Sequence, residues 1–597
     1  MKFLLVAVNS KYIHSNPAVY SLKSSLECLG SGSETVSIAE YTINQDPEEV
    51  RADIFQRKPD AIGFSCYIWN IRYVTDLAED LAKLLPQTAI WVGGPEVSYR
   101  AEELMNRYAW LSGVMVGEGE AVFARLIGAL AEGKRLPKEK SGLVYRDSDG
   151  TIQNGGVSAP VDFSAIPFVY GRDELPENRI VYYESSRGCP YRCSYCLSSI
   201  DKQLRFRNLD LVYQELQYFL DQKTAQVKFV DRTFNCQKER ARQIWTFLRD
   251  HDNGITNFHF EISADLLEEA DFQLLSTLRE GLVQFEIGVQ TTNPLTLRAI
   301  RRTAFRERIF SAVRRIAEGR NIHQHLDLIA GLPYEDYESF RRSFCQVYEL
   351  HPDQLQLGFL KLLSGTEMEK EADGYGMVCS SRPPYEVLKT DWISFEELRR
   401  LKRVEEAVET FYNTCQFSMT VRYLEQKCAD SFSVYELLGE FLGKLHEEGG
   451  KPGRRKLYER TAAFLMERWP QEGDQISQLL TFDYYSRENA KDRPLFCRAS
   501  SEWKEEEKQF YIREAAKRQY LGGYAEADSR QLQRMTHLEV FDWDFVSETD
   551  GTPVKRKTTV VVFDYRIRDF KTFNAKPLVI LDFFENDACK TAGFHIY

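Results

Sequence analysis

Short, continuous apolar runs alternate with helical patterns along the first 130 or so residues of the chain. In the helical stretches, apolar residues recur every three to four positions, which is the spacing of one buried helix face. Strands and helices in strict alternation are typical of right-handed βαβ units and predict a parallel, doubly wound, Rossmann-like sheet. The strands expected here are Lys2–Val8, Glu34–Ala39, Ala61–Ser65, Ala89–Val92 and Val114–Val116, with helices at Ala18–Leu29, Pro47–Arg57 and Arg72–Leu85.

The pattern breaks over residues 136–179, which are polar and turn-rich, and we interpret this stretch as a linker with one small hairpin. The alternation resumes over residues 180–375. Six strand–helix units predict a partial (β/α)6 TIM-like barrel rather than the closed eight-stranded form. Its expected strands are Ile180–Glu184, Gln226–Val230, Phe258–Ile262, Val283–Val289, His323–Ile329 and Gln354–Leu360, with helices at Leu209–Leu220, Gln237–Asp250 and Pro294–Arg301.

Residues 376–597 have a different order, in which helical stretches come first and strand-like segments follow. This order predicts a C-terminal α+β domain behind an N-terminal domain of residues 1–135 and the barrel. Its aromatic residues alternate as in a strand and are expected in the core. The expected helices are Phe395–Tyr412, Val434–Glu447, Arg455–Trp469 and Glu502–Arg518, and the strands are Leu538–Phe545, Lys557–Tyr565 and Leu578–Phe583.

Composition narrows the class of protein. Hydrophobic residues make up 43% and charged residues 28% of the chain, as in an ordinary globular protein. The net charge of −12 argues against a general nucleic-acid coat. No apolar run approaches the roughly 20 residues that span a bilayer, and the N-terminus lacks a signal-peptide cleavage site. We therefore expect a cytoplasmic protein with no membrane partner and no nucleic-acid partner.

The expected strands of the first domain end in polar and glycine-rich segments. Doubly wound sheets bind ligands beyond the carboxyl ends of their strands, where glycine lets the backbone approach closely. Any one of these glycines is equally consistent with a tight turn, but several on one edge favour a ligand cleft. No G-x-G-x-x-G motif is present, so a dinucleotide is not expected. The segments are Asn9-Ser10, Ser65-Cys66-Tyr67, Gly93-Gly94-Pro95-Glu96 and Gly117-Glu118-Gly119-Glu120.

Three of the twelve cysteines lie within eight residues, as Cys189-x3-Cys193-x2-Cys196 behind the first barrel strand. In a cytoplasmic protein this spacing does not indicate disulfides. Three thiolates on one loop can hold a cube of four irons and leave one iron open to another ligand. A zinc site is the alternative, although the second cysteine pair or histidine that zinc usually needs is missing nearby. The distant Cys236 could complete either site.

The segment Cys189-Pro-Tyr-Arg-Cys193-Ser-Tyr195-Cys196 resembles the signature of the radical S-adenosylmethionine (SAM) enzymes. The resemblance implies a [4Fe–4S] cluster that cleaves SAM to a 5′-deoxyadenosyl radical, with Tyr195 beside the adenine. Later strands carry further matches. Each match alone is weak evidence. A buried glutamate in a barrel more often has a structural role, and the arginine-rich stretch that contains Arg301-Arg302 could be a solvent-exposed helix face. The SAM-binding residues so implied are Asp231, Thr233, Glu261, Ser263, Glu286, Gln290, Arg301, Ile329 and Gly331.

The domain in front of this barrel resembles the cobalamin-binding domain of the class B radical SAM enzymes. The usual D-x-H-x-x-G motif is absent, which leaves the lower face of cobalt unassigned. His14 could approach the corrin, and Tyr67, Trp69 and Tyr99 could pack on it, although core packing is as good an explanation. The cobalamin-binding residues so implied are Asn9, Ser65, Tyr67, Gly93, Gly94, Pro95, Glu96, Gly117, Glu118, Gly119 and Glu120.

The whole chain resembles a bacterial subgroup of these enzymes with a family-specific C-terminal domain. The resemblance implies methyl transfer to an unactivated carbon or phosphorus centre of a small molecule or another substrate, and a flavodoxin- or ferredoxin-type electron donor. Related enzymes cyclise or rearrange their substrates instead. A methylthiotransferase would need three additional cysteines, but only Cys28 and Cys66 precede the barrel. A non-catalytic corrinoid protein would leave the barrel motifs without a role.

Overall fold

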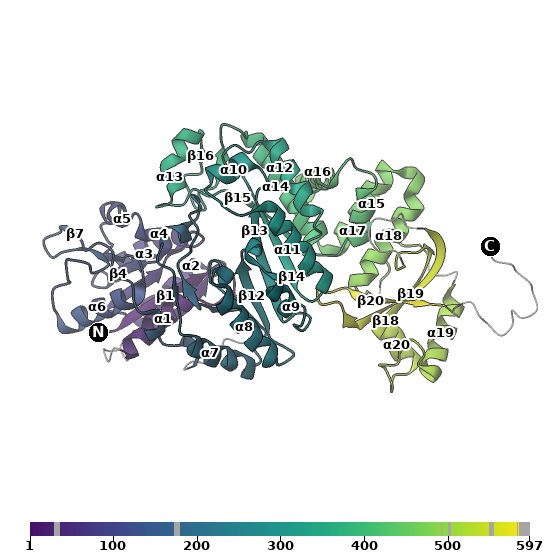
Figure 1. Ribbon diagram of the computed structural model, residues 1–597, viewed down its shortest axis with the longest axis horizontal. Coiled ribbons are helices and arrows are strands. Elements are labelled where there is room, and N and C mark those ends of the chain that lie inside the picture. Colours follow the sequence, from purple (N-terminus) through teal and green to yellow (C-terminus); the bar gives the residue numbers. More distant parts are fainter. Residues whose placement is uncertain are drawn as a thin grey trace, which may run out of the picture. The chain divides into compact units, whose positions relative to one another are not determined.

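The computed structural model describes residues 1–12, 14–28, 36–171, 179–490, 492–498, 503–547, 555–581 and 583 (Figure 1). The chain divides into two compact units. The first is Met1–Ser343 with Gly358–Phe395, and the second is Phe344–Leu357 with Glu396–Tyr597. Glu34 at the start of an expected strand, Cys589 and the side chain of Cys28 lie outside the described part.

The first unit begins with a sheet in the order β2-β1-β3-β4-β5-β6-β7. The first five strands run parallel, and the hairpin β6–β7 adds two antiparallel strands beyond β5. The stretch expected to be a linker thus contributes its hairpin to this sheet. The strand order reverses between β1 and β3, and that switch point is where doubly wound sheets bind ligands. The bounds are β1 Phe3–Asn9, β2 Val36–Thr42, β3 Ala61–Ser65, β4 Ala89–Gly93, β5 Gly113–Met115, β6 Leu143–Arg146 and β7 Ile152–Asn154.

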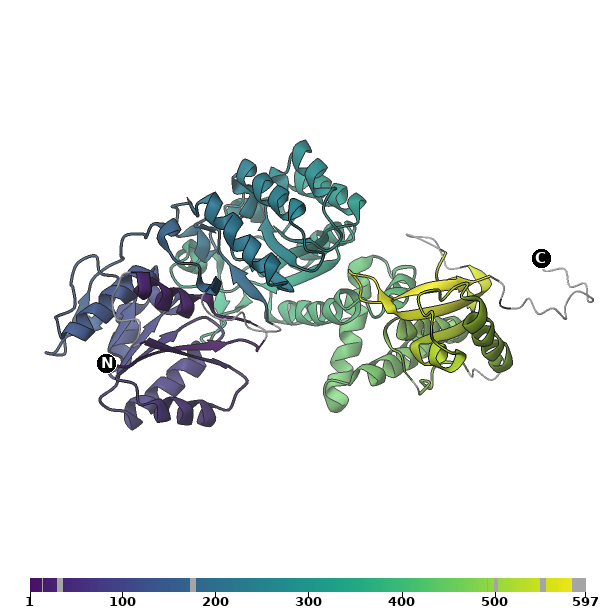
Figure 2. The same cartoon turned by 90° about the horizontal axis from the view of Figure 1, so that it is seen from below.

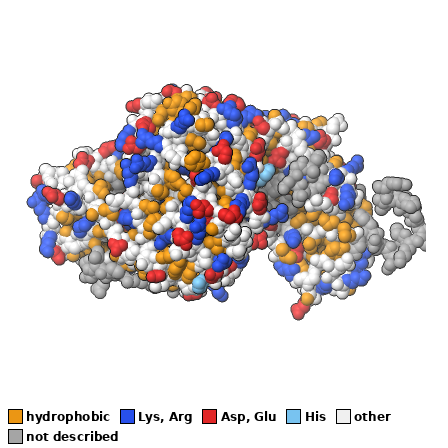
Figure 3. Space-filling view, in the orientation of Figure 1, with side chains coloured by type: hydrophobic (Ala, Val, Ile, Leu, Met, Phe, Trp, Pro, Cys, Tyr) orange, Lys and Arg blue, Asp and Glu red, His pale blue; other side chains and the backbone are white. Residues whose placement is uncertain are grey.

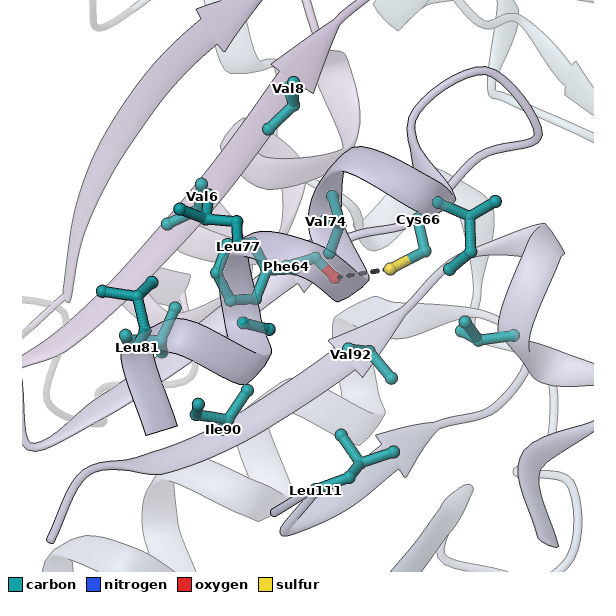
Figure 4. Packing of buried hydrophobic residues seen from close by; sticks show 14 of the residues in the cluster. Val6, Val8, Phe64, Cys66, Val74, Leu77, Leu81, Ile90, Val92 and Leu111 are labelled. Carbon is teal, nitrogen blue, oxygen red and sulfur yellow. Dashed lines mark hydrogen bonds between the residues drawn. The ribbon is translucent and has the colours of Figure 1, made fainter. Parts of the chain in front are cut away.

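Helices cover both faces of this sheet (Figures 1 and 2). Successive side chains of β1 point to opposite faces, so Leu4 and Val6 belong to one core and Phe3 and Leu5 to another. Figure 4 shows the first core, where Cys66 donates its thiol to the carbonyl of Phe64 at 3.8 Å. The helices are α1 Pro17–Cys28, α2 Pro47–Arg57, α3 Ile71–Leu84, α4 Pro95–Ser98, α5 Ala101–Arg107 and α6 Gly119–Glu132.

A second sheet of the chain has six strands in the order β15-β14-β13-β12-β11-β8, and β8 and β11 to β14 run parallel. On β13, the side chains of Val283, Phe285 and Ile287 are buried, whereas those of Gln284 and Glu286 lie on the opposite, partly exposed face. Strands that are consecutive in this order lie side by side in an open sheet, which confirms the expected partial barrel. The bounds are β8 Val181–Tyr183, β11 Gln226–Phe229, β12 Asn257–Ile262, β13 Val283–Gln290, β14 His323–Ala330 and β15 Gln354–Phe359.

Helices and short elements connect these strands. Asn208 begins α7 by accepting hydrogen bonds from the backbone N–H groups of Asp210 and Leu211, as an N-cap residue does. Asn293 caps α10 in the same way, and Pro294 follows at the first helical position. The elements are α7 Leu209–Asp221, α8 Lys238–Asp250, α9 Glu269–Leu275, α10 Pro294–Ala299, α11 Arg306–Gly319, α12 Tyr337–Tyr348, α13 Glu367–Glu371, β16 Val378–Cys379 and β17 Val387–Lys389.

The second unit is mostly helical and ends in the antiparallel sheet β18-β19-β20. Phe541, Phe545 and Phe563 are buried and pack around Phe482, which confirms that these strand aromatics form core. The elements are α14 Phe395–Ala407, a π-helical turn Val408–Asn413, α15 Ser418–Glu425, α16 Ser431–Gly449, α17 Arg454–Arg468, α18 Gly473–Arg487, α19 Lys504–Lys517, α20 Ser529–Met535, β18 Thr536–Trp543, β19 Arg556–Arg568 and β20 Ala575–Ile580.

Basic and acidic side chains are interspersed with apolar ones on the face shown in Figure 3. Within the described residues, no helix combines the length and the apolar character that crossing a membrane requires.

Candidate functional site

A two-residue pair of antiparallel strands closes the loop that carries the three neighbouring cysteines. In this pair, Arg187 of β9 (Ser186–Arg187) lies opposite Arg205 of β10 (Arg205–Phe206). Gly188 follows with a φ of +87°, and a Cβ at this position would lie 2.5 Å from the carbonyl oxygen of Gln203. Because only glycine combines this φ with so close an approach, Gly188 lets the chain turn directly into the cysteine loop.

Backbone hydrogen bonds hold the loop on two sides. The fully buried Ser194 donates its N–H to the carbonyl of Ile300 at 3.0 Å and accepts from the N–H of Met368 at 2.9 Å. Inside the loop, the N–H of Cys196 bonds to the carbonyl of Cys193 at 3.1 Å. Ser194, which directly follows the second cysteine, is therefore fixed from both directions.

The three cysteines are free thiols, with Cys193 buried and the other two half-buried. The hydroxyl of Thr233 lies 3.7 Å from the sulfur of Cys189. The guanidinium of Arg302 lies 3.8 Å from the sulfur of Cys193. Burial raises the pKa of the Cys193 thiol, Arg302 lowers it, and the neighbouring Cys196 and Cys189 raise it again. Three thiolates here would repel one another unless a cation held them together.

An iron–sulfur cube fits this donor set. It accepts three thiolates from one loop and keeps one iron open, and a metal deprotonates the thiols that it binds. Among the residues that the structure describes, no group of three or more His, Cys, Asp or Glu side chains is arranged to hold a single metal ion. The three free thiols on one loop, with Arg302 beside Cys193 and Thr233 beside Cys189, fit the cluster that the sequence pattern indicates.

Two of the residues expected near SAM support the cysteine loop. Asp231 is buried and accepts three hydrogen bonds of 2.7 Å, from the N–H and the hydroxyl of Ser185 and from the hydroxyl of Ser186. Burial raises the pKa of Asp231, and these donors oppose the rise. Thr233 is buried two residues later, beside Cys189. Asp231 therefore anchors the strand that leads into the loop.

Glu261 on β12 and Ser263, which directly follows that strand, differ in their surroundings. Ser263 is buried, donates its N–H to the side chain of Asn235 at 2.9 Å and accepts from the hydroxyl of Tyr191 at 3.3 Å. Tyr191 belongs to the cysteine loop, so Ser263 contacts that loop. Burial raises the pKa of Glu261 to about 7, and the nearby guanidinium of Arg232 opposes the rise.

The two expected residues of β13 are held by the protein itself. The carboxylate of Glu286 forms an ion pair with Lys228 at 3.0 Å and lies 3.0 Å from the imidazole of His259, whose pKa is lowered by burial. Burial would raise the pKa of Glu286, but the bonds to His259 and Lys228 outweigh it and hold that pKa well below its usual value. Gln290 is buried at a φ of +71°, with its side chain lying over Gly288.

The adjacent Arg301 and Arg302 point to different partners. Arg301, at a φ of +55°, is exposed and forms an ion pair with Glu371. Arg302 donates to the carbonyl of Gly288 and reaches Cys193. Of these two arginines, Arg302 is the one whose side chain reaches the cysteine loop.

The residues expected near the adenine are distributed over the loop and the end of β14. Tyr195 is half-buried in the loop, and burial raises the pKa of its hydroxyl, while Arg302 opposes the rise. Ile329 is half-buried on the same strand face as Asp327, and Gly331 follows with a φ of +86°.

A cavity of about 540 Å³ lies at the carboxyl ends of β3, β4 and β5. Gly94, at a φ of +115°, lies so close to Cys66 that a Cβ would be 2.5 Å from its carbonyl oxygen. Gly93, Gly94, Gly117 and Gly119 line the cavity with backbone atoms and no side chain, which lets a flat macrocycle lie close to this edge of the sheet, so the cavity fits a corrinoid. No histidine is among the described residues that line it. The expected cobalamin-binding residues that do line it are Ser65, Tyr67, Gly93, Gly94, Pro95, Gly117, Glu118, Gly119 and Glu120.

Asn9, Glu96 and His14 are not among the lining residues. Asn9 donates to Glu40 at 2.8 Å, and Glu96 accepts from the hydroxyl of Tyr385. The imidazole of His14 lies 2.6 Å from the hydroxyl of Tyr182. These contacts give the three side chains structural partners.

Tyr67 stacks on Trp69, with ring centroids 4.3 Å apart at an interplanar angle of 8°. Tyr67 lines the cavity, and Trp69 is 46% exposed. Tyr99 is also partly exposed and packs against Gly365.

Four side chains that the sequence reasoning did not place together join the cavity to the cysteine loop. Arg187 donates to both carboxylate oxygens of Glu120, at 2.7 and 3.2 Å. Arg205 donates to Glu118 at 3.0 Å. Arg187 also donates to Glu184 at 3.0 Å. We call Arg187, Arg205, Glu118 and Glu120 the arginine clamp.

Comparison with protein families agrees with this organisation. The model of the B12 binding domain matches residues 4–127, that of the radical SAM superfamily matches residues 183–344, and that of a protein of unknown function (DUF4080) matches residues 373–563. Fold and family matches together define a radical SAM enzyme. The chain belongs to the cobalamin-dependent radical SAM family with a C-terminal DUF4080 region, and its cofactors are a [4Fe–4S] cluster, SAM and cobalamin. The family, the fold class and the cofactors expected from the sequence are thereby confirmed.

Curated relatives are distant. A 2-(S-pantetheinyl)-carbapenam-3-carboxylate methyltransferase of Streptantibioticus cattleyicolor is 24% identical over 64% of this chain and 62% of its own length. An anaerobic magnesium-protoporphyrin IX monomethyl ester cyclase of Rubrivivax gelatinosus is 22% identical over 54% of this chain and 60% of its own. The chain therefore spans less than two thirds of either relative. The solved structure of the cobalamin-dependent SAM radical enzyme OxsB superposes with a TM-score of 0.54 at 15% identity, covering 81% of this chain and 78% of OxsB, and shows the same fold.

Proposed function

We propose that this enzyme transfers a methyl group, by way of cobalamin, to an unactivated carbon or phosphorus centre. One observation carries the proposal: the cavity that fits the corrinoid is also lined by Gly188 and Ser198, which flank the three cysteines of the loop. A substrate placed there would meet both cofactors. The methyltransferase among the relatives supports the same choice.

When bound, the cluster supplies the electron that cleaves SAM, and cobalamin carries the methyl group. The chain's own residues hold and shield this chemistry. Arg302 places a positive charge next to the sulfur of Cys193, which stabilises a thiolate there. Asp231 fixes the strand before Cys189. Glu286 stays ionised because His259 and Lys228 hold its pKa well below its usual value.

The substrate we propose is a small molecule that reaches the cavity between β3–β5 and the cysteine loop. The electron donor we propose is a flavodoxin or ferredoxin, because a radical SAM cluster needs one low-potential electron for each cleavage. A chemical reductant can replace this donor in the assay.

The proposal is tested by quantifying two products of SAM under anaerobic conditions. Reconstituted protein is incubated with SAM, cobalamin and a reductant, and S-adenosylhomocysteine and 5′-deoxyadenosine are measured. Loss of the methyl group leaves S-adenosylhomocysteine, whereas reductive cleavage leaves 5′-deoxyadenosine. A methyltransferase is expected to form both, with S-adenosylhomocysteine depending on added cobalamin.

Two variants serve as matched controls. Cys196→Ala is expected to abolish 5′-deoxyadenosine, whereas Cys236→Ala, at a half-buried cysteine outside the loop, should retain it. Formation of 5′-deoxyadenosine without any cobalamin-dependent S-adenosylhomocysteine would contradict methyl transfer and favour cyclisation or rearrangement. Absence of both products from protein with a full iron content would contradict the enzyme assignment.

A further inference from the structure

The arginine clamp joins two segments that are far apart in the sequence. Glu118 and Glu120 flank Gly119 at the start of α6, and Gly117, Gly119 and both glutamates line the cavity that fits the corrinoid. Arg187 and Arg205 are opposite residues of the strand pair that closes the cysteine loop. The clamp thus connects the cavity wall directly to the base of that loop.

The hydrogen bonds of the arginine clamp join charged groups, which makes them stronger than hydrogen bonds between neutral groups. Arg187 meets Glu120 with two parallel hydrogen bonds, and its side chain is only 16% exposed, while that of Glu120 is 8% exposed. Bidentate arginine–carboxylate pairs combine charge with fixed geometry. The hydroxyl of Ser21 on α1 donates to Glu120 at 2.9 Å and holds the carboxylate from the other side. Because water reaches this pair poorly, solvent weakens it less than an exposed pair.

From this geometry we propose that the arginine clamp couples the two cofactor sites, so that cobalamin binding and an ordered cluster loop each favour the other. A corrinoid in the cavity would press on the backbone at Gly117 and Gly119 and fix the glutamate between them. Glu118 and Glu120 would then hold Arg187 and Arg205, and with them the two ends of the loop. Arg187 is a positioning residue in this account.

Thermodynamic linkage makes the proposal measurable without any turnover. Hydroxocobalamin is titrated into iron-free protein and into protein with a reconstituted cluster, without SAM, and the two dissociation constants are compared. For the wild type, we expect binding about 5-fold or more tighter when the cluster is present, which is the low end of common coupling between sites. For Arg187→Gln, we expect the ratio to fall close to one.

Arg279→Gln is the matched control, because Arg279 also forms a two-bond pair with an aspartate, Asp252, but does not line the cavity. It should keep the wild-type ratio. If Arg187→Gln does not fold, as judged by circular dichroism, Arg187→Lys keeps the charge but loses the two-bond geometry and should still lower the ratio. The double variant Arg187→Glu with Glu120→Arg exchanges the two charges and should recover part of the wild-type ratio.

Either of two results would overturn the proposal. One is a wild-type protein whose cobalamin affinity does not depend on the cluster. The other is an unchanged ratio in Arg187→Gln or Arg187→Lys, whichever of the two folds. Both results are independent of what group the enzyme modifies.

Discussion

Replacing Asp231 tests how the cysteine loop is positioned. In the folded chain this carboxylate is 1% exposed and accepts hydrogen bonds from the N–H of Ser185, the hydroxyl of Ser185 and the hydroxyl of Ser186. Asp231→Ala removes both carboxylate oxygens and with them all three hydrogen bonds. Asp231→Asn keeps one carbonyl oxygen and offers an N–H₂ group to the serine oxygens. The two variants have similar backbones and differ in how many buried donors lose their partners.

The magnitude follows from those donors. A buried donor without a partner costs about 1–3 kcal/mol. The two hydroxyls can rotate toward other acceptors, but the N–H of Ser185 cannot, so we expect Asp231→Ala to cost about 3 kcal/mol and Asp231→Asn about 1 kcal/mol. Burial also raises the pKa of Asp231. The ionised form is thus disfavoured in the fold, and wild-type stability falls as pH rises through the folded pKa. The advantage of aspartate over asparagine should therefore shrink at higher pH.

Hydrogen exchange with mass spectrometry measures this effect locally. In iron-free protein, the peptide spanning residues 185–197 should exchange about 100-fold faster in Asp231→Ala and about 5-fold faster in Asp231→Asn, since 1.4 kcal/mol corresponds to a factor of ten. Asp271→Ala is the control, because Asp271 is equally buried but bonds to Arg242, and it should leave this peptide unchanged. Equal exchange in the alanine and asparagine variants would refute the reasoning.

Three further predictions follow from the same contacts. Arg207 and Glu215 form a buried ion pair. Arg207→Met should therefore lower the free energy of unfolding by about 3–5 kcal/mol, whereas the double variant Arg207→Met with Glu215→Leu should lower it far less. A urea titration that gave both variants the same free energy of unfolding would contradict this. The pKa of Glu261 is raised from 4.5 to about 7, so the stability that this side chain contributes is lost as pH rises from about 4.5 to about 7. In thermal melts, the melting temperature of Glu261→Gln should therefore fall less over that pH range than that of the wild type. Arg302 contacts Cys193 and Arg301 does not, so Arg302→Gln should shift the cluster's reduction potential and Arg301→Gln should leave it unchanged; equal shifts would argue against the assignment.

Strands with a strong local pattern could be predicted from the sequence. The expected strand Ala61–Ser65 coincides with β3, and most other parallel strands begin and end within one residue of expectation. The exception is β2, which ends at Thr42, three residues beyond the expected Ala39. Helix α18 could not be predicted in this way. Its residues from Ile476 to Ser486 are all buried, and a helix without a polar face lacks the periodic pattern that marks an amphipathic one.

The candidate site shows the same division between local and distant information. The three cysteines are close in sequence, so their spacing alone indicates a shared site. Arg301 and Arg302 are neighbours after the end of α10, and the left-handed backbone of Arg301 sends their side chains to different partners. No sequence pattern distinguishes the two. The clamp pairs Glu120 with Arg187, 67 residues away, and only the folded sheet edge brings them together.

The central claim is that one chain holds both cofactors around one cavity, and metal analysis with a visible absorption spectrum tests it most directly. Protein purified without oxygen and supplied with iron, sulfide and hydroxocobalamin should contain about four irons and one cobalt for each chain, with corrinoid bands above a broad iron–sulfur shoulder. Cys189→Ala with Cys193→Ala and Cys196→Ala should lose the iron and still bind cobalamin at saturation. Full iron content without any bound corrinoid in the wild-type protein would contradict the account.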